Sequence, residues 1–258
     1  MLLKDRVALV TGGGTGIGRA IATRLAEQGA RVVIASRNLD MLTETARALS
    51  AGGHDVWPVR LDITRPDEID QAVAAVKRRG GRIDILVNNA GLSGMNPMDR
   101  PNDSLWDAVL AVNLTGMYRL TRRVLPEMPD HAGGRVINIS SVLGKFGVPG
   151  YTAYCTAKHG VVGFTRALAA EVAPRGITVN AICPGWVDTQ MAHDGVRQIA
   201  ADLGVTPEAF KKQALEKVPL GRFLDPLEIG DLAVYLASDA ARGMTGQAIN
   251  LCGGATTA

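Results

Sequence analysis

Short apolar runs alternate along this chain with longer segments of helical character. The runs cover residues 7–10, 31–35, 56–61, 83–87, 135–139, 177–182 and 247–251. Such near-continuous apolar runs, rich in β-branched residues, are typical of strands buried on both faces of a parallel sheet. The pattern therefore predicts seven parallel strands.

The segments between the first strands have the features of helices. Residues 17–28 end at Gly29, a plausible C-cap, residues 39–49 end near Gly52, and residues 67–79 lie between Pro66 and Gly80. Alternating strands and helices predict an α/β fold with a doubly wound, seven-stranded parallel sheet and helices on both faces. No linker or repeat divides the chain, so we expect residues 1–258 to form a single domain.

One segment interrupts the alternation. Residues 188–218 have mixed helical character and lie between two regular elements. We interpret this segment as a lid over a substrate pocket. The alternative is a solvated helical insertion without a role in binding.

Composition and charge narrow the functional classes. Hydrophobic residues make up 47% and charged residues 21% of the chain, as in globular proteins. The net charge of +3 and its scatter do not indicate nucleic-acid binding. Three Cys and four scattered His indicate neither a disulfide framework nor a metal site. The charged N-terminus and the lack of a long apolar stretch predict a cytoplasmic protein that neither enters nor spans a membrane.

A glycine-rich turn follows the first strand directly. It reads Thr11-Gly12-Gly13-Gly14-Thr15-Gly16-Ile17-Gly18 and opens into a helix. Glycines let backbone N–H groups approach a pyrophosphate, and a helix N-terminus attracts its charge. The context predicts a dinucleotide site of the Rossmann type, although the spacing is G-x-x-x-G-x-G and a plain tight turn is the alternative. The predicted cofactor contacts here are Gly12, Gly14, Thr15, Gly16, Ile17 and Gly18.

The tip of the second strand indicates the cofactor. It reads Ser36-Arg37-Asn38 and carries no carboxylate that could bind the ribose 2′-OH of NAD. A guanidinium can bind phosphate oxygens in a bidentate manner, so Arg37 favours NADP(H) over NAD(H). The alternative for Arg37 is a solvated surface side chain.

A candidate catalytic set follows the fifth strand. Ser141 lies at the tip of that strand, and Tyr154 precedes Lys158 by four residues. If one helix includes both, they share a face, and the ammonium is expected to lower the pKa of the tyrosine. Such a tyrosine can exchange a proton with an alcohol or alkoxide, and Ser141 can hydrogen-bond a substrate carbonyl. The alternative is a buried tyrosine ring without chemistry.

These motifs together resemble the short-chain dehydrogenase/reductase family over nearly the full length. The matching segments are the glycine turn, Asn88-Asn89-Ala90-Gly91, Asn113, the set Ser141, Tyr154 and Lys158, and Pro184-Gly185. The resemblance implies that Tyr154 is the acid/base, that Lys158 binds the nicotinamide ribose, that Ser141 polarises the carbonyl and that Asn113 holds a water.

The same resemblance implies further cofactor contacts. Asp62 would contact adenine beside Ile63, and residues after the fourth and sixth strands would line the nicotinamide half: Asn89, Ala90, Gly91, Pro184, Gly185, Val187 and Thr189. Asn88, Asn138 and Ser140 are expected to be structural, and Cys155 and Cys183 to be small core residues.

The substrate is less defined. Segments such as Asn180-Ala181-Ile182-Cys183-Pro184-Gly185 resemble bacterial aromatic-polyketide ketoreductases and the related 3-oxoacyl-carrier-protein reductases. The resemblance implies an NADPH-dependent ketoreductase acting on a β-keto acyl thioester or a related polyketide or cyclic ketone. The chain departs from the polyketide group after Gly91, where it reads Leu92-Ser93-Gly94-Met95 in place of a Pro-Gly-Gly stretch. The candidate pocket residues are Ser93, Met95, Val142, Leu143, Phe146, Tyr151, Trp186 and Met191.

Two alternatives stay open. One is an NAD(P)-dependent dehydrogenase that oxidises a small hydroxy acid, such as 3-hydroxybutyrate, or a sugar. The other is a nucleotide-binding sensor without turnover, which would not need all four candidate catalytic residues. Lys145, Arg122, Arg123 and Arg222 are candidates to attract an acyl carrier protein or coenzyme A, or are ordinary solvated charges. The family resemblance also implies a homotetramer.

Overall fold

The computed structural model describes residues 1–131 and 133–257 and contains one parallel sheet. The strand order is β3-β2-β1-β4-β5-β6-β7, so the direction of winding reverses between β1 and β4. The predicted doubly wound α/β fold is confirmed. The strands are β1 (Val7–Thr11), β2 (Arg31–Ser36), β3 (Val56–Arg60), β4 (Ile85–Asn88), β5 (Arg135–Ile139), β6 (Thr178–Pro184) and β7 (Ala248–Leu251).

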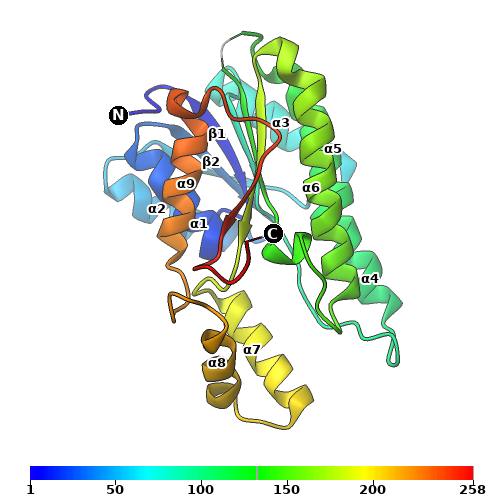
Figure 1. Ribbon diagram of the computed structural model, residues 1–258. Coiled ribbons are helices and arrows are strands. Elements are labelled where there is room, and N and C mark those ends of the chain that lie inside the picture. Colours follow the sequence, from blue (N-terminus) through cyan, green and yellow to red (C-terminus); the bar gives the residue numbers. More distant parts are fainter. Residues whose placement is uncertain (132, 258) are drawn as a thin grey trace.

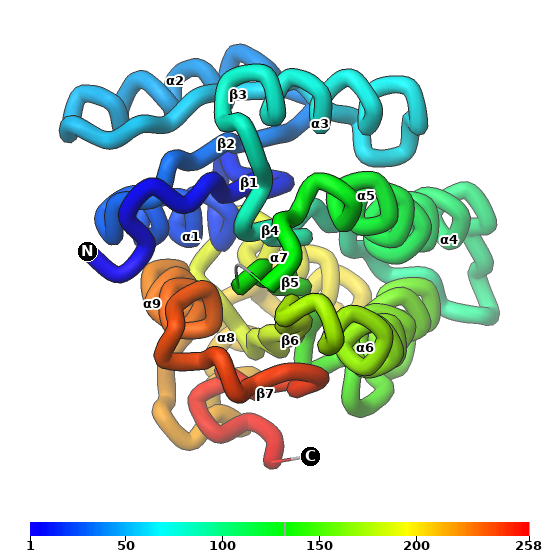
Figure 2. The backbone as a smooth tube through the Cα atoms, turned by 90° about the horizontal axis from the view of Figure 1, so that it is seen from above, coloured from blue at the N-terminus to red at the C-terminus, as the bar shows by residue number. Residues whose placement is uncertain are grey.

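Helices cover both faces of the sheet (Figures 1 and 2). One layer holds α1 (Gly16–Glu27), α2 (Leu39–Ala51) and α9 (Pro226–Ala237). The opposite layer holds α3 (Pro66–Gly80), α4 (Asp103–Leu110), α5 (Met117–Val124) and α6 (Thr152–Val172). The remaining helices, α7 (Gln190–Leu203) and α8 (Pro207–Glu216), lie beyond the carboxyl ends of the strands (Figure 1).

The sheet separates two apolar cores, and β1 contributes to both. Ala8 and Val10 pack with α1, α2 and α9, whereas Val7 and Leu9 pack with α3, α5 and α6. A strand buried on both faces needs apolar side chains at every position, which explains the continuous runs in the sequence. Burial of one such Leu side chain stabilises the fold by about 1.5–3 kcal/mol.

The predicted strands lie in the right places, with small differences at their ends. The fourth begins at Ile85 rather than Ile83 and ends at Asn88, and just before it the side chain of Asp84 accepts a hydrogen bond from the Val7 backbone N–H at 2.8 Å. The sixth extends to Pro184, which pairs with Leu251 of β7. The carboxyl ends of β4 and β6 lie at the edge of the sheet where the predicted site residues follow.

Residues 188–218 form α7, α8 and their connections. The chain enters and leaves this region at one place, where Val187 and Leu224 form an isolated parallel bridge. The Asp188 N–H donates to the Leu224 carbonyl and the Leu224 N–H donates to the Trp186 carbonyl, both at 2.9 Å. Trp186 stacks on Phe223 with ring centroids 5.3 Å apart. The helical insertion is therefore closed at its base.

No helix within the described residues is long and apolar enough to cross a membrane.

Candidate active site

The glycine turn after β1 is closely packed. A Cβ on Gly18 would lie 2.2 Å from the Gly12 carbonyl oxygen, and one on Gly13 would lie 2.6 Å from Cγ2 of Ile34. Gly12 has a positive φ of 65°. Side chains at these positions are excluded by backbone and core atoms. Gly13 was not among the predicted cofactor contacts, and its packing against β2 explains why a third glycine is needed.

The end of β4 braces this turn. The Thr11 hydroxyl oxygen accepts hydrogen bonds from the backbone N–H groups of Asn89 and Ala90, both at 3.0 Å. The Asn89 side-chain amide donates to the Thr11 carbonyl at 2.9 Å and to the Gly12 carbonyl at 3.3 Å. Asn89 was predicted to line the cofactor, and in the structure its side chain holds the glycine turn in place. Thr11 has a bracing role that the sequence analysis did not identify.

Asn113 lies in a π-helical turn, Ala111–Gly116, between α4 and α5. Its amide donates to the Leu92 carbonyl at 2.8 Å and accepts from the Leu92 N–H at 2.7 Å. A Cβ on Gly91 would lie 3.6 Å from Asn113 Oδ1 and 3.9 Å from Lys158 Nζ. The buried amide thus fixes the segment after β4 beside the lysine. Its implied role of holding a water stays a prediction.

The tip of β5 is tied to helix α6. Ser141 is buried, and its Oγ accepts a hydrogen bond from the Leu143 N–H at 3.1 Å. The preceding Ser140 hydroxyl donates to the Lys158 carbonyl at 3.0 Å, a structural role as expected from the sequence. These contacts fix the strand tip against the helix that carries Tyr154 and Lys158.

Helix α6 begins at Thr152, so it includes both Tyr154 and Lys158. The two residues are one turn apart on the helix, and Lys158 Nζ lies 5.4 Å from the centre of the tyrosine ring. The same ammonium donates to the Ile139 carbonyl at 2.8 Å. The expectation that one helix includes both Tyr154 and Lys158 is therefore confirmed.

Burial is the largest influence on the pKa values of Tyr154 and Lys158. It raises the pKa of Tyr154 to about 12, although a hydrogen bond with Ser141 acts in the opposite direction. It lowers the pKa of Lys158 to about 8. The pKa of Tyr154 is therefore raised and not lowered as expected, because burial of the phenol outweighs its hydrogen bond with Ser141.

A buried amide network lies beneath the site. The Asn88 amide donates to Thr121 Oγ1 at 2.9 Å and to Asn138 Oδ1 at 2.8 Å. The Asn138 amide donates to Thr165 Oγ1 at 2.9 Å. The network joins β4 and β5 to α5 and α6, so Asn88 and Asn138 act as braces, as expected. Cys155 and Cys183 are buried thiols.

The predicted adenine contacts lie at the tips of β2 and β3. Burial acts to raise the pKa of Asp62, but hydrogen bonds from Thr64 and the charges of Arg37 and Arg60 bring it below its usual value. Asp62 Oδ1 accepts from the Thr64 N–H at 3.0 Å and from its hydroxyl at 2.7 Å. Ile63 is buried in the core.

The side chains at the β2 tip are more exposed. Arg37 is exposed and has no ion-pair partner in the part of the chain that the structure describes. Asn38 is the N-cap of α2, and its Oδ1 accepts from the Met41 N–H at 3.1 Å. The half-buried Ser36 donates to the Asn38 carbonyl at 3.4 Å.

The predicted nicotinamide contacts follow β6. The Gly185 N–H donates to the Leu251 carbonyl at 3.0 Å, and Val187 is buried at the base of the insertion. Thr189 is the N-cap of α7, and its methyl group lies 3.2 Å from where a Cβ on Gly16 would be. The glycine turn and the start of α7 are therefore in contact.

The candidate pocket residues differ in their burial. Val142 and Tyr151 are buried, Phe146 and Met191 are exposed, and Ser93, Met95, Leu143 and Trp186 are half-buried. Met95 contributes to an open cavity of about 420 Å³ between the segment after β4 and α7. Its other lining residues are Pro97, Arg100, Asn102, Gln198, Ala201 and Asp202.

Asn96 anchors one wall of this cavity and was missed in the sequence. Its N–H donates to the Gly150 carbonyl at 2.6 Å, and its carbonyl accepts from the Thr152 hydroxyl at 2.9 Å. Its side chain accepts from the Asn102 N–H at 2.7 Å. The residue thus connects the segment after β4 with the start of α6. No local sequence pattern predicts this role of Asn96, because Gly150 and Thr152 are far from it in the sequence.

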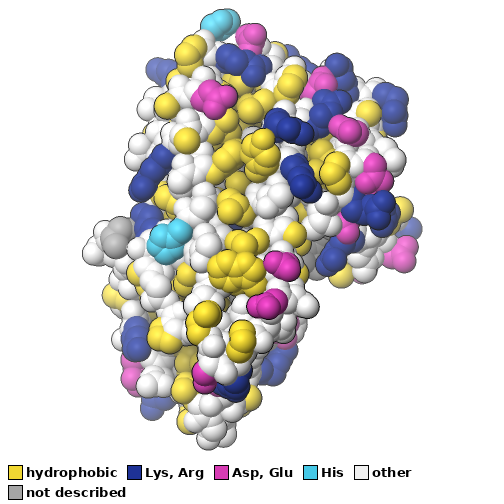
Figure 3. Space-filling view, turned by 90° about the vertical axis from the view of Figure 1, so that its right-hand side faces the viewer, with side chains coloured by type: hydrophobic (Ala, Val, Ile, Leu, Met, Phe, Trp, Pro, Cys, Tyr) yellow, Lys and Arg dark blue, Asp and Glu magenta, His cyan; other side chains and the backbone are white. Residues whose placement is uncertain are grey.

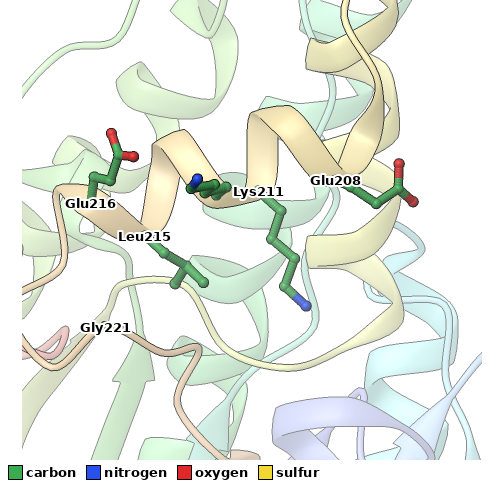
Figure 4. A pocket seen from close by; sticks show the side chains of 6 residues that line it. Glu208, Lys211, Leu215, Glu216 and Gly221 are labelled. Carbon is green, nitrogen blue, oxygen red and sulfur yellow. The ribbon is translucent and has the colours of Figure 1, made fainter.

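Another cavity, of about 560 Å³, lies between α8 and the segment that follows it (Figure 4). Charged side chains of α8 and the backbone near Gly221 line it, and none of the predicted site residues does. Within the described residues, no group of His, Cys, Asp and Glu side chains could hold a metal ion.

Comparisons with known proteins agree with this geometry. A protein of Streptomyces virginiae named as a putative ketoacyl reductase of the monensin polyketide synthase is 45% identical over 252 residues, 97% of either chain. The 3-oxoacyl-[acyl-carrier-protein] reductase of Thermotoga maritima is 39% identical and is matched over 98% of this chain and 99% of its own. The crystal structure of a single-substitution variant of the actinorhodin polyketide ketoreductase with NADPH superposes with a TM-score of 0.93, at 42% identity and 98% coverage of both chains.

The family model for short chain dehydrogenases matches residues 6–200, which include the glycine turn, the β4 tip and the Ser141, Tyr154 and Lys158 set. The sheet order, the braced glycine turn and this set of side chains are thus the shared architecture of one family. The chain belongs to the short-chain dehydrogenase family.

Proposed function

We propose that the protein is an NADPH-dependent ketoreductase whose substrate is a β-keto acyl thioester or a related polyketide or cyclic ketone. The observation that carries the proposal is the convergence of Ser141, Tyr154 and Lys158 at the strand edge that also holds the glycine turn. Relatives named as ketoacyl reductases match the chain from end to end, which supports the same activity.

The residues present fit a dinucleotide. The turn is closed by glycines where side chains would collide with backbone, and α1 begins directly after it. The positive end of that helix and the adjacent N–H groups suit a pyrophosphate. Arg37 is exposed and without an ion-pair partner within the described residues, which suits a 2′-phosphate. In this proposal Asp62 would contact the adenine half of the cofactor and Gly91 the nicotinamide half.

In the proposed reaction the bound cofactor supplies a hydride to the carbonyl carbon. Tyr154 retains its proton throughout the physiological pH range, because its pKa is raised to about 12. It therefore acts as the acid that protonates the carbonyl oxygen as negative charge develops there. Ser141 donates a second hydrogen bond to that oxygen, and the Lys158 ammonium stabilises the tyrosinate that is left.

The first test measures loss of NADPH absorbance with acetoacetyl-coenzyme A, trans-1-decalone and simple ketones as substrates. Tyr154→Phe removes the proton donor, and we expect its kcat to fall by at least about 10²-fold. NADPH affinity, measured by fluorescence titration, should remain within about twofold because the ring stays in place. Tyr235→Phe, on the exposed surface of α9, removes a hydroxyl outside the site and should retain full activity.

Each part of the proposal has its own contradicting result. Full activity of Tyr154→Phe would exclude the phenol as the acid. Turnover with NADH alone would exclude the cofactor assignment and favour a hydroxy-acid dehydrogenase. NADPH binding without turnover of any ketone would favour a nucleotide sensor.

Presentation of the substrate on coenzyme A or an acyl carrier protein is part of the same proposal. Two of the four basic residues considered for it are engaged in ion pairs: Arg123 with Asp70 and Glu127, and Arg222 with Glu228. Arg122 lies over the ring of Tyr118. Lys145 is half-buried and follows Ser141 by four residues, which supports a contact close to the active site.

We also propose a cytoplasmic homotetramer. The outer face of α6 carries the exposed small residues Gly163, Ala167 and Ala170, which allow close approach of a second helix. Tyr118 is 44% exposed and contacts Phe164 edge to face beside them. Hydrophobic side chains lie along the middle of this side of the molecule, and Lys and Arg lie on both sides of them, most densely toward the right-hand edge (Figure 3). This pattern is typical of a surface that another subunit covers.

A further inference from the structure

We propose that Arg60 is a second arginine of the 2′-phosphate site and that Glu68 positions it there. The inference rests on the proposed use of NADPH and concerns the discrimination of NADPH from NADH. It assigns a specificity role to a side chain on the strand next to Arg37.

The sheet register places Arg60 beside the tip of β2. Ser36 and Arg60 are direct partners in the parallel ladder between β2 and β3. Side chains of paired residues project from the same face of a sheet and lie within reach of each other. The tip of β2 is where a dinucleotide fold distinguishes the ribose hydroxyl from the 2′-phosphate. Arg60 therefore lies one strand away from the group it would recognise.

Glu68, in the first turn of α3, holds Arg60 at this edge. Its side chain is 12% exposed, and its Oε2 lies 2.7 Å from Nη1 of Arg60. The same oxygen accepts a hydrogen bond from the Asp62 N–H at 2.8 Å. One carboxylate thus joins the guanidinium to the backbone of the predicted adenine contact. The arginine is fixed relative to the cofactor site rather than free in solvent.

Two guanidinium groups converge on Asp62. Arg37 follows β2 and Arg60 ends β3, and both charges act to lower the pKa of Asp62. The Arg60 side chain is 54% exposed, which leaves donors on the side away from Glu68 accessible to a ligand. Two planar donors at the ends of adjacent strands match the several acceptor oxygens of a phosphate dianion. A ribose hydroxyl offers no such charge.

The test measures dissociation constants for NADPH and NADH by fluorescence titration, without any ketone. In Arg60→Gln the Kd for NADPH should rise about tenfold, as expected for one charge-assisted contact, while the Kd for NADH changes less than about twofold. Arg60→Lys keeps the charge but loses the planar fork, so its Kd should lie between the two. Arg79→Gln is the matched control. It has the same 54% exposure and also pairs with a carboxylate, but it lies at the opposite end of α3.

Arg37→Gln separates this inference from the proposed function. If wild-type protein binds NADPH and NADH equally and Arg37→Gln changes neither, the NADPH assignment itself fails. If Arg37→Gln weakens NADPH but Arg60→Gln behaves like Arg79→Gln, the assignment holds and the role of Arg60 is refuted. Equal weakening of NADPH and NADH in Arg60→Gln would also refute it, because the contact would then involve the adenosine rather than the phosphate.

Discussion

Lys158 is a buried cation whose ammonium donates a hydrogen bond to the Ile139 carbonyl and faces no carboxylate within the described residues. A charge that is removed from water in this way destabilises the folded state unless partners compensate it. The loss of hydration lowers the pKa of Lys158 to about 8. In the proposed function the lysine would therefore contribute to the chemistry at the expense of stability.

The first prediction at this scale concerns Lys158→Met, which removes the charge and keeps a similar volume. Between pH 8 and pH 10.5 the unfolded lysine binds a proton that the folded one has lost, so wild-type stability rises with pH in that window. We expect Lys158→Met to melt a few degrees higher than wild type at neutral pH and to lack reductase activity. The difference in Tm should shrink toward pH 10.5. A variant less stable than wild type at neutral pH would show that the ammonium contact stabilises the fold.

At the scale of elements, the site depends on contacts between segments that are distant in the chain. Asn96 fastens the segment after β4 to the start of α6, and Asn113 fastens it to the π-helical turn. On the other side, Thr189 brings α7 against the glycine turn. Helix α7 therefore borders both the proposed cofactor site and the cavity of about 420 Å³.

An ion pair joins two of the residues that line the open cavity between these elements. Arg100, after β4, lies 2.8 Å from Asp202 of α7. We predict that Arg100→Asp lowers kcat/KM by about two- to fivefold, the range of an exposed pair, and that adding Asp202→Arg restores it. High salt should remove the difference. Arg197→Asp makes the same charge change on α7 but alters a pair within that helix, so it should leave kcat/KM near wild type. Failure of the double variant to recover would refute a role for the pairing.

At the scale of the whole molecule, the fold could be predicted because the five central strands, β2, β1, β4, β5 and β6, are buried on both faces. The site was readable where chemistry follows local spacing, as for Ser141 at a strand tip and for Tyr154 and Lys158 one turn apart. Contacts between residues that are distant in the sequence, such as Asn96 with Gly150, could not be predicted. The direction of the Tyr154 pKa was wrong because spacing reports a neighbouring charge but not the loss of solvent.

The proposed assembly gives the prediction at this scale. Light scattering should report a mass about four times 27.2 kDa. Gly163→Arg places a long charged side chain on the outer face of α6, where the glycine has no neighbour within 4 Å in the described part of the single chain. It should reduce the assembly to a smaller species while leaving the monomer folded by circular dichroism. A wild-type mass near 27.2 kDa would contradict the tetramer.

The bridge between Val187 and Leu224 has a further consequence. Because the chain leaves the sheet region and returns to it at the same point, everything between these residues is a cassette with fixed ends. Its length and sequence can change at little entropic cost, since loop closure depends only weakly on loop length. Exchange of this cassette between relatives should alter which ketones are accepted without disturbing the sheet, so it is a natural unit for evolution and for engineering.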